Sequence, residues 1–291
     1  MRTAARLRQD AETLAGPLPA LLAAAEHLAA SVMAGEHGRR RVGQGDQFWQ
    51  YRPSHPGDEA RAIDWRRSAR SDGPFVREKE WQAAQSVMLW LDTGQSMEFS
   101  SAKGLTTKAD SARRLALALS ILLIRGGERV GLSNIGLQPR SGHVQLMRLT
   151  ASLAEKAEDR EYIAPELRGI PARSRAVFFS DFLGDLDPVE ASLTQAADRG
   201  IDGALVQILD PQEEAFPFNG RTIFESVGGS LAHETLKASD LRDRYLDRLA
   251  ERKAALKALA RATGWQYHCH HTDRSAASAL LWLYGAMERA H

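Results

Sequence analysis

The sequence contains little cysteine and no long hydrophobic run. Cys269 is the only cysteine among 291 residues, which excludes an internal disulfide and fits a reducing compartment. The longest apolar stretch, residues 115–124, is interrupted by Ser120 and is shorter than the roughly 20 residues that a membrane-spanning helix needs. Residues 1–16 include acidic side chains and no apolar core, unlike a secretory signal. We therefore expect a cytoplasmic protein without membrane insertion.

The sequence also lacks an excess of charge and the common catalytic motifs. Its formal net charge is +1 at pH 7, so its overall electrostatic field gives no reason to expect nucleic acid as a partner. Neither a phosphate-binding G-x-x-x-x-G-K-[ST] loop nor a G-x-S-x-G nucleophile elbow is present. Nucleotide hydrolysis by a P-loop and serine hydrolase chemistry are therefore not indicated.

Strands and helices alternate in the second part of the chain. The continuous apolar run 87–91 predicts a strand that is buried on both faces. Further strands are expected at 129–135, with a hairpin partner at 137–140, and at 176–180, 204–209, 221–227 and 265–270, and helices at 107–125, 143–157, 188–199, 236–262 and 275–289. This order predicts an α/β fold, a doubly wound, mostly parallel sheet with helices on both faces.

The first part of the chain differs in composition from the second. The periodic apolar residues of 17–33 predict a helix with one buried stripe, and glycines and prolines divide residues 39–85 into short strands and loops. We accordingly expect three segments, an N-terminal helical segment at 1–37, a strand-rich Arg/Trp appendage at 38–85 and the α/β domain at 86–291.

The most specific motifs lie between residues 38 and 99. They read GRRRVGQGDQFWQYRPSHPGDEARAIDWRRSAR at 38–70 and VMLWLDTGQSM at 87–97. These stretches resemble the domain-of-unknown-function-58 family, whose members join such a segment to a von Willebrand factor A-like domain. The resemblance rests on the family-motif residues Gly57, Asp58, Arg61, Ile63, Asp64, Trp65, Ala69 and Arg70. It implies a von Willebrand factor A-like fold and a MoxR-type AAA+ ATPase as partner in the assembly or activation of other proteins.

Asp92 follows the first strand of the predicted sheet, at the edge where open parallel sheets bind ligands. The family resemblance implies a metal-ion-dependent adhesion site there, built from an Asp-x-Ser-x-Ser loop, a threonine and a later aspartate. Asp92, Ser96 and Asp181 match that pattern, whereas Gly94 replaces the first serine and no threonine matches. We therefore expect a degenerate Mg²⁺ site at these three residues, with water replacing the missing hydroxyl.

Two other interpretations of Asp92 remain open. In the first, Asp92 and Asp181 cap the following turns through backbone hydrogen bonds and bind no metal. In the second, they form the centre of a metal-dependent hydrolase, for which Glu98 and Asp185 are the available carboxylates. Asp92-Thr-Gly is also the signature of aspartic proteases, but the chain has no second copy and its helices contradict an all-β body. The preferred interpretation is that the protein is a non-enzymatic interaction module.

Arginines and aromatic residues interleave between residues 38 and 81, as in proteins that bind single-stranded nucleic acid. Acidic residues such as Asp58, Asp64 and Glu78 lie among them and neutralise much of the positive charge. We therefore favour a structural scaffold or partner surface, in which Asp and Arg pairs and buried tryptophans form a satisfied polar network. Single-stranded nucleic-acid binding remains the alternative.

Overall fold

The computed structural model describes residues 41–43, 47–55, 58, 63–70, 73–81, 84–153, 160–220, 222–225, 232–235 and 239–289. These residues fall into two compact units, and the chain passes from the smaller to the larger between Ala84 and Gln85. The helix predicted at 17–33 and the boundary predicted between residues 37 and 38 lie outside the described residues.

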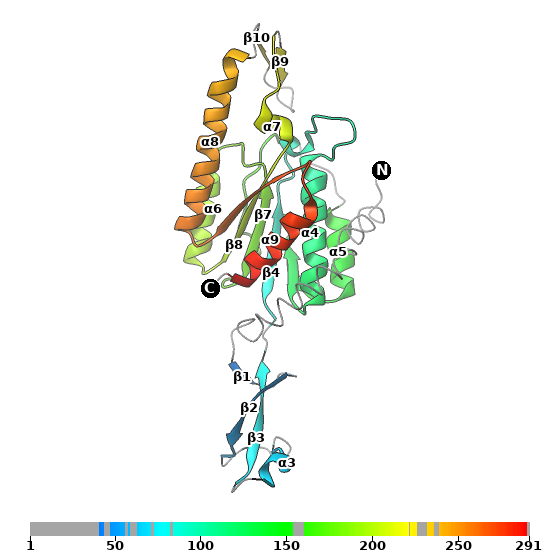
Figure 1. The fold of residues 1–291 in the computed structure, drawn as a ribbon, viewed down its shortest axis with the longest axis vertical. Coiled ribbons are helices and arrows are strands. Elements are labelled where there is room, and N and C mark those ends of the chain that lie inside the picture. Colours follow the sequence, from blue (N-terminus) through cyan, green and yellow to red (C-terminus); the bar gives the residue numbers. More distant parts are fainter. Residues whose placement is uncertain are drawn as a thin grey trace. The chain divides into compact units, whose positions relative to one another are not determined.

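The larger unit is built on a six-stranded sheet with the strand order β11-β8-β7-β4-β5-β6 (Figure 1). The pairs β11 with β8, β8 with β7, β7 with β4 and β4 with β5 are parallel, and β5 with β6 is antiparallel. The strands are β4 Ser86–Leu91, β5 Arg129–Leu132, β6 Leu137–Arg140, β7 Arg175–Ser180, β8 Asp202–Leu209 and β11 Gln266–His271. The predicted doubly wound, mostly parallel sheet is thereby confirmed.

Helices cover both faces of this sheet, because successive side chains of a buried strand point in opposite directions. On one face, Trp90 and Phe178 pack edge to face with ring centroids 5.8 Å apart, in one core cluster with Leu193 and Leu256. On the other face lie α4 and α9, which pack against each other. The helices are α4 Lys108–Arg125, α5 His143–Leu153, α6 Asp187–Asp198, α8 Ser239–Ala262 and α9 Ala276–Arg289. Among the described residues, no helix combines the length and apolar character needed to cross a membrane.

Several short elements connect the strands. They are the 3₁₀ turns η2 Gln95–Glu98 and η3 Ser133–Ile135, the helix α7 Pro211–Ala215 and the antiparallel pair β9 Thr222–Glu225 and β10 Ala232–Thr235. The strand predicted to reach residue 135 ends at Leu132, because η3 and the left-handed Gly136 turn the chain back into β6. Sequence reasoning missed α7 and β10.

The smaller unit is a three-stranded antiparallel sheet with a short helix. Its strands are β1 Arg41–Gly43, β2 Gln47–Pro53 and β3 Phe75–Trp81, in the order β1-β3-β2, and its helix is α3 Trp65–Ser68. The Asp64 carboxylate caps α3 by accepting hydrogen bonds from the backbone N–H groups of Arg66 and Arg67, and it accepts a third from the Tyr51 hydroxyl. The capping aspartate thus fixes the turn that precedes α3.

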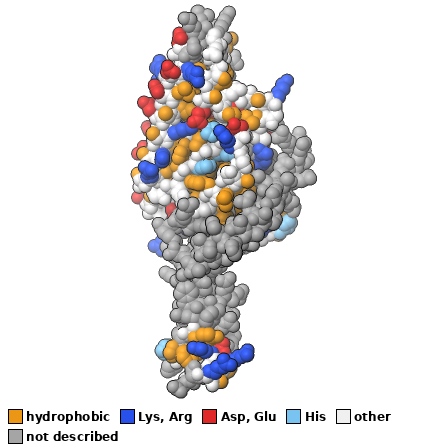
Figure 2. All heavy atoms as spheres, viewed as in Figure 1, with side chains coloured by type: hydrophobic (Ala, Val, Ile, Leu, Met, Phe, Trp, Pro, Cys, Tyr) orange, Lys and Arg blue, Asp and Glu red, His pale blue; other side chains and the backbone are white. Residues whose placement is uncertain are grey.

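The expectation of a buried tryptophan is wrong for Trp65, whose surface is 64% exposed. Trp65 is the first residue of a one-turn helix in which no residue is buried, so its ring has no core to enter. The Arg67 guanidinium lies 5.5 Å from the centroid of the Tyr51 ring and 5.8 Å from that of Phe75. Figure 2 shows basic and hydrophobic side chains next to each other on this unit.

Gly203 provides a test of the packing between β7 and β8. It pairs with Ala176, and a Cβ atom at residue 203 would lie only 1.7 Å from the Ala176 carbonyl oxygen. We expect Gly203→Ala to lower the free energy of unfolding by about 3 kcal/mol or more, measured by urea denaturation. In the control variant Gly126→Ala the nearest atom is 3.4 Å from the added carbon and φ is −74°, so the change should stay within about 1 kcal/mol. Equal losses in the two variants would contradict this account.

Candidate functional site

Asp92 is positioned by the end of β4 at the carboxyl edge of the sheet. Its backbone N–H donates to the Phe179 carbonyl at 2.8 Å, which continues the pairing with β7 beyond Leu91. The two carboxylate oxygens accept hydrogen bonds from the Gly94 N–H at 2.7 Å and from the Ser180 hydroxyl at 2.6 Å. Only 4% of Asp92 is exposed, so the carboxylate lies inside the protein.

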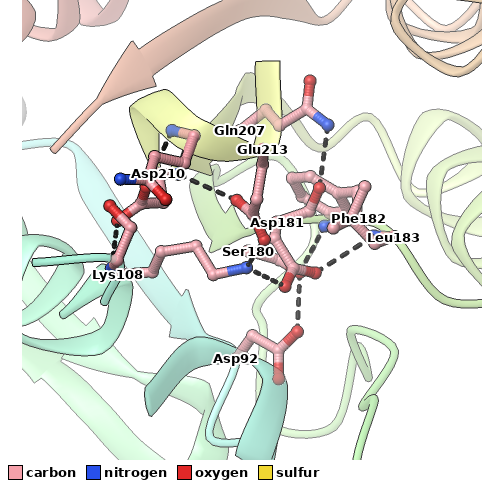
Figure 3. A network of polar contacts seen from close by, with 11 residues as sticks. Asp92, Lys108, Ser180, Asp181, Phe182, Leu183, Gln207, Asp210 and Glu213 are labelled. Atoms are coloured by element: carbon pink, nitrogen blue, oxygen red, sulfur yellow. Dashed lines mark hydrogen bonds and ion pairs between the residues drawn. The ribbon is translucent and has the colours of Figure 1, made fainter. Parts of the chain in front are cut away.

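Asp181 follows β7 on the neighbouring strand and is fully buried. Its Oδ1 atom accepts a hydrogen bond from the Leu183 N–H at 3.0 Å, and its backbone carbonyl accepts one from the Gln207 side chain at 2.8 Å. Its Oδ2 atom lies 2.8 Å from the ammonium of Lys108 (Figure 3). Asp92 and Asp181 therefore lie at the ends of adjacent parallel strands, and the hydroxyl of Ser180, the residue before Asp181, donates to Asp92.

Lys108 is a site residue that sequence reasoning missed. It is the first residue of α4, its side chain is 1% exposed, and its ammonium lies between Asp181 and Glu213, 2.6 Å from the latter. The ammonium also lies 5.7 Å from the centroid of the Phe99 ring. A cation in the first turn opposes the helix dipole, which favours negative charge there. A lysine directly after the capping Thr107 was thus a signal that a compensating anion lies nearby.

Glu213 reaches the site from α7 and is oriented by a capping box. The Asp210 side chain accepts a hydrogen bond from the Gln212 N–H at 2.8 Å, and Glu213 Oε2 accepts one from the Asp210 N–H at 2.8 Å. The second oxygen of Asp210 accepts a hydrogen bond from the Ser101 N–H at 2.9 Å. The order Asp-Pro-Gln-Glu at 210–213 is the sequence signature of such a helix start, and it was the signal that could have predicted α7.

The absence of the first serine hydroxyl has a structural cause at Gly94. A Cβ atom on this residue would lie 2.6 Å from the Glu161 carbonyl oxygen and 2.9 Å from Asp92 Oδ1. The same carbonyl accepts a hydrogen bond from the Ser96 N–H at 3.0 Å, which holds it against the loop. The backbone at Glu161 therefore occupies the space that a serine side chain would need.

Ser96 is buried in η2, and within the described part of the chain its hydroxyl makes no hydrogen bond. An orphaned hydroxyl suits a metal ligand, but Asp181 is already neutralised by Lys108. Among the described residues no group of three or more His, Cys, Asp or Glu side chains is arranged to hold a metal ion. The set Asp92, Ser96 and Asp181 therefore does not fit a divalent ion as it stands, and Mg²⁺ binding stays a prediction for titration to test.

Burial raises the pKa of Asp92 from 3.8 to about 7. The Asp181 carboxylate adds to this rise, whereas hydrogen bonds from Ser180 and Gly94 and the charge of Lys108 oppose it. A carboxyl with a pKa of about 7 exchanges its proton near neutral pH. The charge at the end of β4 is therefore sensitive to small changes around it.

Burial has the opposite effect on the pKa of Lys108, and the neighbouring carboxylates reverse it. Burial alone would lower the pKa of its ammonium, but Asp181 and Glu213 outweigh that effect and raise the pKa above 10.5. Burial also raises the pKa of Glu213, against the attraction of Lys108. The lysine is therefore charged at physiological pH and supplies the positive charge of the site.

Glu98 and Asp185, the two further carboxylates considered for hydrolysis, have other partners. Glu98 pairs with Arg113 at 3.2 Å, and Asp185 accepts a hydrogen bond from the Asp187 N–H at 3.1 Å. A cavity of about 190 Å³ lies beside Asp92, with Arg113 in its lining. Small-molecule sites usually occupy about 300–1,000 Å³, so this cavity is smaller than an ordinary substrate pocket.

The predicted family-motif residues lie in the smaller unit and shape its turns. Asp58 accepts a hydrogen bond from the His55 N–H at 2.7 Å, Ile63 bridges to Val76, and Ala69 ends α3. Asp64 is the α3 cap described above. Of the other motif residues, Trp65 and Arg70 are exposed, and Gly57 and Arg61 lie outside the described residues.

The larger unit thus defines a class, a doubly wound α/β domain whose sheet ends in a buried ion network. The chain matches the family described as "Protein of unknown function DUF58" over residues 50–255, and it belongs to that family. The match covers most of the Arg/Trp appendage, including all the predicted motif residues, and most of the α/β unit.

The chain is also similar to curated relatives and to solved structures. Uncharacterized proteins of Mycobacterium bovis and Mycobacterium tuberculosis are 26% identical over 257 residues, which is 84% of this chain and 80% of theirs. An aerotolerance-related membrane protein from Bacteroides fragilis has 14% identity and a TM-score of 0.39 over 70% of this chain and 98% of its own. The hypothetical protein BatB from Bacteroides thetaiotaomicron has 14% identity and a TM-score of 0.37, with the same coverage.

The pKa of Asp92 predicts a pH-dependent stability. Because the folded pKa of about 7 exceeds the unfolded value of 3.8, the folded state binds the proton more tightly, and this stabilisation is lost as the pH rises from about 4 to about 7. Relative to Asp92→Asn, which mimics the protonated form, wild type should lose up to about 4 kcal/mol of unfolding free energy over that range. Urea denaturation of both proteins between pH 4 and pH 8 measures the difference. A constant difference would contradict the prediction.

The short distance between Gly94 and the Glu161 carbonyl predicts that a serine at position 94 destabilises the protein. Gly94→Ser should lower the free energy of unfolding by about 1–3 kcal/mol, because its Cβ meets a backbone carbonyl that is itself hydrogen-bonded. Gly94→Ala carries the same Cβ without the hydroxyl and should lose a similar amount in chemical denaturation. A Gly94→Ser variant as stable as wild type would contradict the steric conflict that the structure predicts.

Proposed function

We propose that the protein is a non-enzymatic interaction module and the partner of a MoxR-type AAA+ ATPase in the assembly or activation of other proteins. Membership in the DUF58 family supports the partner class through the resemblance described above. The observation that carries the proposal is the ion network at the carboxyl edge, in which Asp181, Lys108 and Glu213 satisfy one another. Such a buried network can hold the surrounding loops in a fixed position, which suits a surface for recognition.

Access argues against turnover at this site. A general base must come within hydrogen-bond reach of the proton that it removes from a substrate. Asp92, Ser180 and Asp181 are all buried, and the cavity that Asp92 lines is smaller than an ordinary substrate pocket. The Ser180 hydroxyl already donates to Asp92. A hydrolase centred on Asp92 and Asp181 would need these groups to be open to a substrate, so the interaction module is the better supported function.

The cavity beside Asp92 is the place where we expect the partner to dock. It is lined by Thr93, Arg113, Asn134 and Ile135, among others, and the Ile135 side chain is 51% exposed. A cavity of this size suits one anchoring side chain of a partner protein, surrounded by a rim of polar and apolar groups. The cavity lies beside Asp92 at the carboxyl edge, where this class of sheet binds its ligands, and this position supports the proposed docking site.

A surface substitution tests this docking site without disturbing the core. A MoxR-type ATPase purified from the same organism should bind wild type in biolayer interferometry, and Ile135→Asp should weaken that binding about tenfold or more, the effect of losing one apolar contact. The matched control is Ile223→Asp, because Ile223 is 57% exposed on β9 and does not line the cavity.

Two outcomes would count against the proposal in different ways. If no binding is seen with ATP, with ADP or without nucleotide, the ATPase is not the partner. If Ile135→Asp and Ile223→Asp bind as wild type does, the partner docks elsewhere. Circular dichroism of both variants shows whether they remain folded.

A further inference from the structure

Three separate elements converge on one buried ammonium. Lys108 at the start of α4 places its Nζ atom 2.8 Å from Asp181 Oδ2 at the end of β7 and 2.6 Å from Glu213 Oε1 on α7. Both distances are those of charge-assisted hydrogen bonds. The site thus contains a fixed positive charge at the carboxyl edge, next to the aspartates that were expected to bind a metal ion (Figure 3).

We propose that the Lys108 ammonium takes the place of a divalent cation at this site, so that the native protein binds neither Mg²⁺ nor Mn²⁺ there. The role of the metal, to neutralise and orient Asp181, is performed by the protein's own side chain. The family resemblance implied a metal site, and this chain has converted it into a metal-independent one.

The coordination chemistry favours the lysine over an ion. Mg²⁺ requires oxygen ligands at about 2.0–2.1 Å in near-octahedral geometry. An ion that approached Asp181 this closely would lie next to the ammonium and be repelled by it. On the opposite side of the predicted set, the Glu161 carbonyl blocks the space of the first serine hydroxyl at Gly94. The lysine beside Asp181 and the missing hydroxyl at Gly94 thus both disfavour the binding of a metal ion.

The ammonium is held firmly in this position. The two carboxylates that it contacts are themselves anchored, Asp181 by the Leu183 N–H at 3.0 Å and Glu213 by the Asp210 N–H at 2.8 Å. The lysine side chain is 1% exposed, and the Phe99 ring lies 5.7 Å from its charge. Because its partners are fixed and its stem is buried, Lys108 has no solvent-facing position to which it can withdraw when an ion arrives.

Substitution of Lys108 tests this inference directly. Wild type should show no heat of binding when titrated with MgCl₂ or MnCl₂ by isothermal calorimetry, and no rise in melting temperature. Lys108→Ala removes the ammonium and leaves two anchored carboxylates beside the space that the lysine side chain occupied, so it should gain Mn²⁺ binding and a melting temperature that rises with MnCl₂. Lys108→Gln, which fills more of that space, should gain the same response if the alanine variant does not fold without metal.

Two control variants separate metal binding from a general change in stability. Lys108→Arg keeps the positive charge and should gain no response to Mn²⁺. Lys108→Ala combined with Asp181→Asn removes the charge pair together and should also remain unresponsive. Binding of either ion to wild type that is lost in Asp181→Asn would overturn the inference, and so would a folded Lys108→Ala or Lys108→Gln variant that binds no Mn²⁺. Choline chloride at matched ionic strength controls for salt effects.

Discussion

The ion network around Lys108 is the interaction on which the carboxyl edge of the sheet depends. It joins the first turn of α4, the end of β7 and the short helix α7. Burial makes such a network costly unless every charge is compensated, and removal of one partner from a buried pair typically costs about 3–5 kcal/mol. The network therefore fixes the geometry of the loops that surround Asp92.

Close backbone contacts at two glycines shape the sheet and the loop after β4. Gly203 allows β8 to approach β7, and Gly94 allows the Glu161 carbonyl to close over the loop after β4. The two glycines act differently, because the first belongs to the sheet and the second determines which ligands the loop can offer. Near Asp92, the backbone of Glu161 and the ammonium of Lys108 both occupy space beside the strand ends.

Much of the fold was predictable because its signals are local. The apolar run that became β4, the periodicity of α4 and the proline at the start of α6 each act within a few residues. The positions of Asp92 and Asp181 at strand ends followed from the same pattern. The exposure of Trp65 was not predictable, because a tryptophan is buried only when a core lies within its reach, and the one-turn helix α3 offers none.

By itself, the sequence determined the alternation of strands and helices, the family and the two aspartates at the strand ends. Only the tertiary structure decided what those aspartates do, because the decisive contacts are distant along the chain. Lys108 meets Asp181 across 73 residues and Glu213 across 105. No local pattern encodes such pairs, since their energy depends on burial and on the exact position of a charge among three elements. The sequence thus places the two aspartates at strand ends, and folding brings the Lys108 ammonium between Asp181 and Glu213.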